Sequence, residues 1–387
     1  MKSKLSFIIG MLVVYIFSSG VSYVIFKNTA PKTASVIIPE EQEVNPGEGF
    51  KLDQTLPKTE ACPLNGRLYT KPEKAIWDNR RPLGVMLENH TEARPHSGLS
   101  KADVVYEAVA EGGITRFLAL FYCGIGENTE FAPVRSARTY YLDWVSEYDG
   151  LYNHVGGAGI CSDVTVNERA KALCQIGKYG IKDMDQFGIS FPTCYRNPDR
   201  LDHPVATEHQ MVCQSDKLYE IAKERGWTNV DEDGVAWDKS FTSWKFKQEA
   251  KAPERGTTAT ISMYWWKGYS DYEVTWEFDT TTNLYKRLNG GKPHVELETG
   301  QQLTASNVVV QFVKETGPVD EHKHMLYQTI GSGDALIFMD GNVIEGTWTK
   351  KSRVSRTLFY DEKRKEVTFN PGVIWIEAIP AGNDVTY

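Results

Sequence analysis

The chain has 387 residues, of which 41% are hydrophobic, and this is enough for two domains with a full hydrophobic core. Its 51 acidic residues outnumber its 43 lysines and arginines, and the net charge of −8 excludes a general nucleic-acid-binding protein. Aromatic residues are dense in the last third of the chain, which favours β-structure there over a helix bundle.

The N-terminus predicts a membrane anchor in residues 1–27. Residues 5–26 are mostly apolar, and a helix of this length just spans the ~30 Å hydrocarbon core of a bilayer. Lys2 and Lys4 precede this segment, so we expect a single-pass protein with a cytoplasmic N-terminus and the bulk of the chain outside the cell. The alternative is a removed signal peptide whose cleavage site lies at residues 18–20.

Composition divides the rest of the chain into a linker and two domains. Residues 28–60 combine prolines, glycines and acidic residues without a hydrophobic period, which predicts an extracytoplasmic linker. Strand and helix patterns alternate over residues 61–235, which predicts a mixed α/β layer domain. Strand patterns separated by turn sequences, with no long helix, predict an all-β domain over residues 244–387. The expected fold class is therefore α+β or α/β.

The sequence predicts several helices and strands in the first domain. Short apolar runs predict strands at residues 82–87, 103–107, 115–122 and 151–155. Aromatic residues at helical spacing predict a helix that is capped by Ser136 and runs to about residue 148. Capping signals at Thr165 and Thr207 each predict a further helix, and the second of these is expected to end at Gly226.

The second domain reads as a series of strands. Turn sequences separate them, of which Asp340-Gly341-Asn342 is typical. The expected strands lie at residues 259–265, 272–278, 283–288, 308–313, 335–339, 357–360 and 373–379.

Six cysteines lie outside the predicted anchor, and an even number in an extracytoplasmic protein predicts disulfides. The local pairings that we expect are Cys161 with Cys174 and Cys194 with Cys213, although six cysteines allow other pairings. No CxxC motif is present, which argues against a zinc knuckle or a thioredoxin-type site. All six precede residue 214, so any disulfide stabilises the first domain only.

Arginines lie among turn and cap residues in the motifs RPHSGLSKADVVYE, EGGITRF and PVRSAR. Arginine keeps its charge and binds phosphate or carboxylate through a planar fork. The motifs therefore predict an anion-binding face formed by Arg94, Arg116, Arg135, Ser136 and Arg138. The alternative is that the arginines pair with acidic side chains inside the domain: Glu107, Glu111 or Asp143.

Two acidic residues are candidate ligands for Mg²⁺. Glu88 follows the first predicted strand and Asp103 begins the second, and Mg²⁺ prefers one or two carboxylates together with ligand phosphates. The alternative is that these acids neutralise the nearby arginines.

A glycine-rich turn, HVGGAG, follows the fourth predicted strand. His154, Gly156 and Gly157 are candidate ligand-binding residues there, because such a turn lets the backbone approach a phosphate. A plain left-handed turn explains the glycines equally well. His322 and His324 follow two acidic residues, and we expect a loop histidine pair there rather than a metal site.

Several motifs in order make the chain resemble the bacterial YerB-like lipoprotein family. They are PVRSAR, EGGITRF, RPHSGLSKADVVYE, NVVVQFV, GSGDALIFMDGNVIEGTW and NPGVIWIEAIP, and the resemblance covers about residues 61–387. The resemblance implies anchoring outside the cell, usually through a lipidated cysteine. Here a hydrophobic segment stands in its place. The family name implies no activity.

The order of acidic and arginine-rich segments is also similar to that of the LytR-CpsA-Psr glycopolymer transferases, although the motif spelling differs. That likeness implies a polyprenyl pyrophosphate held by arginines and Mg²⁺. The sequence therefore favours a cell-envelope protein that binds an anionic, phosphorylated or carboxylated ligand, such as a cell-wall precursor or polymer. The alternatives are a Mg²⁺-dependent phosphoryl or glycosyl-phosphate transferase and a structural scaffold, with a protein partner at the β domain.

Overall fold

A computed structural model describes residues 55–387. The predicted anchor, residues 1–27, lies outside the described residues, and so does most of the predicted linker. Within residues 55–387, no helix is both long enough and apolar enough to cross a bilayer.

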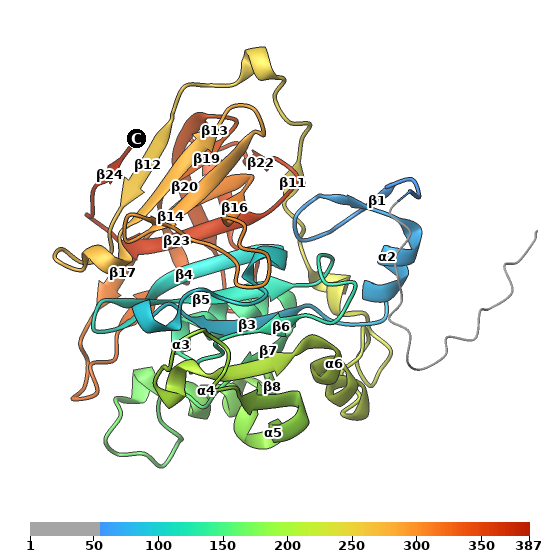
Figure 1. The fold of residues 1–387 in the computed structure, drawn as a ribbon, viewed down its shortest axis with the longest axis vertical. Helices are drawn as coiled ribbons and strands as arrows, with labels where there is room; N and C mark the ends of the chain where they lie inside the picture. Colours follow the sequence, from blue (N-terminus) through green and yellow to red (C-terminus); the bar gives the residue numbers. More distant parts are fainter. Residues whose placement is uncertain (1–54) are drawn as a thin grey trace, which may run out of the picture. The chain divides into compact units, whose positions relative to one another are not determined.

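The largest element is an eleven-stranded sheet that contains strands from both halves of the chain (Figure 1). Its halves meet where β23 pairs in parallel with β4, with Ile374 opposite Val104. In sheet order its strands are β21 (Leu358–Asp361), β20 (Asn342–Lys350), β19 (Gly331–Met339), β17 (Asn307–Thr316), β23 (Ile374–Pro380), β4 (Val104–Glu111), β5 (Ile114–Phe121), β3 (Leu83–Glu88), β7 (Leu151–His154) and β8 (Lys182–Asp185), and β18 (Leu326–Gln328) pairs with β17. The sheet therefore crosses the predicted boundary between residues 235 and 244.

A second sheet of six strands belongs to the C-terminal half alone. It consists of β15 (Lys292–Pro293), β14 (Leu284–Asn289), β13 (Val274–Asp279), β12 (Thr260–Met263) and β24 (Val385–Thr386), with β16 (Thr304–Ala305) paired to β14. Trp276 of β13 packs against Trp375 of β23 with ring centroids 5.3 Å apart, and both side chains are fully buried. The two sheets therefore enclose an aromatic core.

Short strand pairs complete the β-structure. They are β1 (Glu60–Ala61) with β2 (Leu68–Tyr69), β10 (Met211–Gln214) between β6 (Glu130–Phe131) and β9 (Cys194–Arg196), and β11 (Lys245–Phe246) with β22 (Thr368–Phe369). All seven strands predicted for the second half are present. The described residues are thus mostly β-structure in several sheets, whereas a separate α/β layer domain over residues 61–235 stays a prediction.

The α-helices of residues 55–387 all lie in the first half of the chain. They are α2 (Lys71–Trp77), α3 (Thr139–Val145), α4 (Ala172–Tyr179), α5 (Gln186–Thr193) and α6 (Ser215–Glu224). In Figure 1, α4, α5 and α6 gather around β7 and β8, on the side of the sheet away from the C-terminal strands.

The predicted start of α3 was wrong. Arg138, and not Ser136, is the N-cap residue of this helix. The residues before it are extended, because Val134 forms a β-bridge with Leu87 and Ala137 forms one with Gly157. These bridges keep Ser136 in a strand-like conformation and delay the first helical turn.

The two capping signals also begin different elements from those predicted. Asn167, not Thr165, caps a short 3-10 helix (Glu168–Ala170), since the Thr165 hydroxyl instead bonds Asp163. Thr207 begins only a 3-10 helix (Thr207–His209), because β10 intervenes before α6. Local capping patterns are equally compatible with a single 3-10 turn.

Three disulfides are present, and both predicted pairs are among them. Cys161 pairs with Cys174 and Cys194 with Cys213, while the third bond joins Cys62 to Cys123. All three hold the first half of the chain, as expected.

Candidate functional site

A pocket of about 540 Å³ opens on the surface where the arginine motifs meet. Five of the residues predicted to bind an anion line it: Arg116, Arg135, Ser136, Arg138 and Gly157. Further lining residues include Glu111, Asp163, His322 and His324.

Main-chain pairing brings these segments together. Arg116 projects from β5, which pairs with β3. The PVRSAR segment joins the end of β3 through the bridge between Val134 and Leu87, and it reaches the glycine-rich turn through the bridge between Ala137 and Gly157. Three separate motifs therefore meet where β3 and β7 end.

Glu111 lies between two of the arginines. One of its carboxylate oxygens accepts a hydrogen bond from Arg116 at 3.2 Å, and the other accepts one from Nε of Arg138. Burial alone would raise the pKa of Glu111, but the charges of Arg116 and Arg138 outweigh burial and hold this pKa below its ordinary value. The predicted internal pairing is thus present at Glu111.

Arg135 and Arg138 each keep guanidinium N–H groups that have no hydrogen-bond partner within residues 55–387. Arg135 donates from Nε to Glu88 at 3.0 Å, and its side chain is 27% exposed with no further protein partner for its terminal nitrogens among the described residues. Arg138 uses Nε and Nη1 on Glu111 and the Ala137 carbonyl, and its Nη2 makes no hydrogen bond within residues 55–387. The arginines are therefore positioned by carboxylates on one side and have unused donors on the other.

Arg94 is not part of this pocket. It donates to the side chain and carbonyl of Asn89 and to the carbonyl of Asp271, and it lines a separate cavity of about 270 Å³. Burial lowers the pKa of Arg94 to about 10, and the charge of Arg287 adds to this effect. Arg94 therefore joins the two halves of the chain.

The glycine-rich turn is explained mainly by local geometry. Gly156 has a φ of +56°, and its N–H donates to Asp185 at 2.8 Å, so the main chain there is already bonded. His154 is fully buried and bonds both the Gly156 carbonyl and Asp183. Only Gly157 of this predicted group lines the pocket, where a Cβ atom would lie 3.1 Å from that of Ala137.

The structure separates the two predicted Mg²⁺ ligands. Glu88 lies opposite Arg116, which in turn lies opposite Ala108 of β4, whereas Asp103 precedes the first residue of that strand. Five residues along a strand correspond to roughly 17 Å. Glu88 and Asp103 therefore cannot bind one metal ion together, and Mg²⁺ binding by either carboxylate alone stays a prediction.

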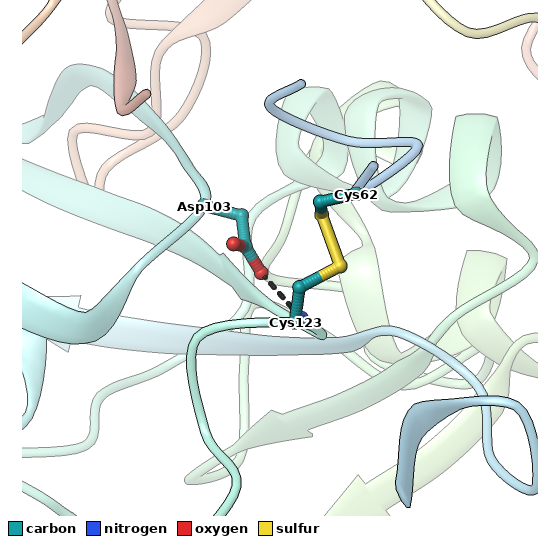
Figure 2. A group of neighbouring side chains, drawn as sticks. All are labelled: Cys62, Asp103 and Cys123. Carbon is teal, nitrogen blue, oxygen red and sulfur yellow. Dashed lines mark hydrogen bonds between the residues drawn. A yellow bond between two sulfur atoms is a disulfide. The ribbon is translucent and has the colours of Figure 1, made fainter. Parts of the chain in front are cut away.

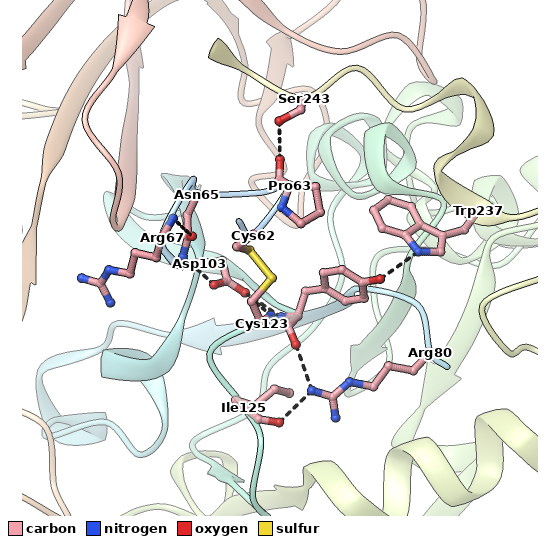
Figure 3. The surroundings of a disulfide bond; sticks show 11 residues. Cys62, Pro63, Asn65, Arg67, Arg80, Asp103, Cys123, Ile125, Trp237 and Ser243 are labelled. Atoms are coloured by element: carbon pink, nitrogen blue, oxygen red, sulfur yellow. Dashed lines mark hydrogen bonds between the residues drawn. A yellow bond between two sulfur atoms is a disulfide. The ribbon is translucent and has the colours of Figure 1, made fainter. Parts of the chain in front are cut away.

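Asp103 instead holds the loop around a disulfide. Figure 2 shows its carboxylate beside the Cys62–Cys123 bond, and one oxygen accepts from the main chain of Tyr122 at 2.7 Å and of Cys123 at 3.0 Å. In Figure 3 the side chain of Asn65 donates to the other oxygen. Burial raises the pKa of Asp103 to about 6, although these main-chain donors oppose the shift.

Comparison with known proteins gives the family. Models described as "Protein of unknown function (DUF3048)", N-terminal domain and C-terminal domain, match residues 66–228 and 261–376. A Bacillus subtilis (strain 168) protein named "Putative lipoprotein YerB" is 28% identical over 322 residues, which cover 82% of this chain and 86% of that protein. The chain belongs to the YerB-like family.

A solved structure supports the fold of this YerB-like protein. The crystal structure of YerB from Bacillus subtilis matches with a TM-score of 0.69 at 23% identity, and the match covers 85% of this chain and all of that one. The relative is named as a lipoprotein, whereas the first cysteine here, Cys62, is bonded to Cys123.

The sequence interpretation missed the contribution of the C-terminal half to the pocket. His322 and His324 reach it because Asp320 accepts a hydrogen bond from the main chain of Asn167 at 3.0 Å. Asp320 also bonds Nδ1 of His324 at 2.8 Å, and the other ring nitrogen lies 4.0 Å from Glu111. The only sequence signal was the i, i+4 spacing of Asp320 and His324, which does not reveal a contact with a segment more than 150 residues away.

Proposed function

We propose that this YerB-like protein binds an anionic envelope ligand, phosphorylated or carboxylated, in the arginine pocket. The observation that supports this most directly is the division of donors on Arg135 and Arg138. Each guanidinium is held by a carboxylate on one side and keeps terminal N–H groups for a ligand on the other. Guanidinium groups fixed in advance bind a planar or tetrahedral anion without losing further side-chain entropy.

The size and charge of the pocket suit a small anionic group. A volume of about 540 Å³ lies within the range of ordinary ligand sites. The three arginines pair in part with Glu88 and Glu111, whereas the lining residue Asp163 bonds Thr165, so a ligand anion would bind to the guanidinium N–H groups that have no carboxylate partner. The Ser136 side chain adds a hydroxyl at the same wall.

We further propose an extracytoplasmic, membrane-anchored location. Three disulfides fit an oxidising compartment, where such bonds persist. The relative's name describes a lipoprotein, and the apolar residues 5–26 would provide the anchor in this chain.

The proposal is tested by a thermal-shift titration of the full-length chain with inorganic pyrophosphate and, separately, with citrate. A ligand at 100 times its dissociation constant adds ~2.7 kcal/mol of stability. An unfolding entropy of ~2.1 cal/mol/K per residue gives roughly 0.7 kcal/mol/K for about 330 folded residues, so the melting temperature should rise by about 4 °C.

Two variants make the titration specific. Arg135→Gln combined with Arg138→Gln should abolish the shift, while Arg364→Gln should preserve it, because Arg364 is exposed on the turn that follows β21. An equal shift in the double variant would place the anion elsewhere and refute the proposed pocket. No shift in the wild type with either anion would refute binding of both ligand classes.

A further inference from the structure

A second group of polar side chains lies on the other side of Glu88. His90, Glu92 and His209 each offer one potential ligand atom, and these atoms all lie within 4.8 Å of one another. His90 caps the 3-10 helix Thr91–Ala93 directly after β3, and His209 ends the 3-10 helix that precedes β10. The two 3-10 helices, one after β3 and one before β10, therefore fix the positions of the three residues.

His209 is oriented as a metal ligand would be. Its side chain is 6% exposed, and Nδ1 bonds Oε2 of Glu88 at 2.8 Å. With Nδ1–H donating to this carboxylate, the lone pair of Nε2 points away from Glu88. Nε2 lies 3.7 Å from Oε2 of Glu92, which is too long for a hydrogen bond. A carboxylate on the remote nitrogen is the usual partner of a metal-bound histidine.

His90 is half-buried and Glu92 is exposed, so the space between the three candidate ligand atoms is accessible from solvent. The rings of His90 and His209 stack with centroids 4.8 Å apart and an interplanar angle of 12°. Nδ1 of His90 accepts only a long hydrogen bond, 3.3 Å, from the main chain of Glu92, and a metal bond could replace it. The Glu92 side chain is 60% exposed and can turn toward an ion.

We propose that His90, Glu92 and His209 form a binding site for a divalent transition metal, with Zn²⁺ as the ion that their chemistry suits best. Two imidazoles and one carboxylate are a common zinc ligand set, and they leave a fourth position for water or an anion. Glu88 orients His209 and, through its other oxygen, holds Arg135 at the wall of the arginine pocket. The metal site and the anion pocket thus share one carboxylate, but the metal site does not depend on anion binding.

The other cluster of metal-type residues within residues 55–387 carries no such proposal. It consists of Cys62, Asp103 and Cys123, and the two sulfur atoms are bonded to each other (Figure 2). A disulfide offers no thiolate for a metal.

The test uses the full-length chain without a polyhistidine tag. Zn²⁺ binding is measured by isothermal titration calorimetry, and Co²⁺ is added separately to record its visible absorption bands, which report ligand number and geometry. We expect one high-affinity equivalent of Zn²⁺. His90→Ala combined with Glu92→Gln should weaken its binding by more than about tenfold, and Glu88→Gln should weaken it by roughly 10–100-fold.

The matched control is another histidine beside a carboxylate. His203 and Asp202 are exposed and lie 2.7 Å apart, and within residues 55–387 they belong to no cluster of three potential metal ligands. Asp202→Asn combined with His203→Ala should leave Zn²⁺ affinity unchanged. Wild-type affinity in the His90→Ala/Glu92→Gln variant, or an equal loss in the control variant, would overturn the proposed site. Arg138→Gln should retain Zn²⁺ binding, which separates failure of this site from failure of the anion pocket.

Discussion

Arg287 occupies the centre of the contact between the two halves of the chain, and its replacement gives the sharpest test of the fold. Its side chain is fully buried and donates to Glu107 of β4 at 2.5 Å. It also lies over the rings of Phe117, Trp276 and Trp375, with the closest centroid at 4.8 Å. Arg287→Met preserves most of this packing volume while removing the charge and the hydrogen bonds.

The expected cost follows from the charges that remain. Glu107 has no exposed surface, and burial together with the charge of Glu107 raises the pKa of neighbouring Glu377 well above its ordinary value. Without Arg287, the Glu107 carboxylate loses its only cationic partner among the described residues. Removing one member of a buried ion pair costs about 3–5 kcal/mol. At roughly 0.7 kcal/mol/K, the melting temperature should fall by about 4–7 °C.

A double-mutant cycle separates the ion pair from packing. Melting temperature and urea unfolding are measured for Arg287→Met, Glu107→Gln and the combined variant, with exposed Arg364→Met as the control. The combined variant should be more stable than the sum of the single effects predicts, by at least about 1 kcal/mol, because neither charge is left alone. Additive effects, or a loss below about 1 kcal/mol for Arg287→Met, would refute the reasoning.

Three further predictions concern the first half of the chain. Replacing Cys62 and Cys123 by alanine should lower the free energy of unfolding by about 4 kcal/mol, and replacing Cys161 and Cys174 should lower it by about 3 kcal/mol, because the sequence separations are 61 and 13. Urea unfolding measures both losses. The reverse order would contradict loop-closure entropy as their cause. The pKa of Glu111 is lowered in the folded state, so its ion pairs should stabilise the wild type relative to Glu111→Gln fully above the ordinary pKa of 4.5. This advantage should shrink as the pH falls below 4.5. A difference in melting temperature that does not change with pH would contradict the pairing. The pKa of Asp103 is raised to about 6, so wild type should gain stability relative to Asp103→Asn as the pH falls from 7 toward 4, and a gain in the opposite direction would contradict burial as the cause.

Strand positions could be predicted where the apolar runs were dense. The fully buried pattern of β3 and the mostly buried β23 come from continuous apolar sequence, and both were placed within a residue or two. β20 was missed, although the Asp340-Gly341 turn before it was recognised. Most of its residues are exposed or half-buried, and Gly346 lies within it, so no apolar run marks it as a strand.

The sequence indicated which arginines belong to the candidate site, but it did not indicate which side chains contact them. Arg116, Arg135 and Arg138, which the arginine motifs indicated, line one pocket, and their binding of an anion stays a prediction. Their carboxylate partners depend on strand register, which a single sequence does not determine. For the same reason the sequence does not show that Glu88 and Asp103 lie at opposite ends of their strands, or that His322 and His324 line the pocket.

A chain of hydrogen bonds connects Arg287, in the buried contact between the N-terminal and C-terminal halves of the chain, to Glu88, which lies between the two proposed sites. Arg287 donates to Nδ1 of His294, Nε2 of His294 meets Nδ1 of His96 at 2.9 Å, and Nε2 of His96 meets the Glu88 carbonyl. Burial lowers the pKa of His96 to about 3 and that of His294 well below its ordinary value, so both rings are neutral.

Neutral rings fix the direction of every bond in this chain. Each imidazole accepts at Nδ1 and donates from Nε2, so the series runs from the Arg287 guanidinium to the main chain of Glu88 without a mismatch. Glu88 then holds Arg135 with one carboxylate oxygen and His209 with the other. The C-terminal half therefore fixes the position of Glu88 through this chain of bonds, and the proposed ligand and metal ion would meet side chains that are already in place.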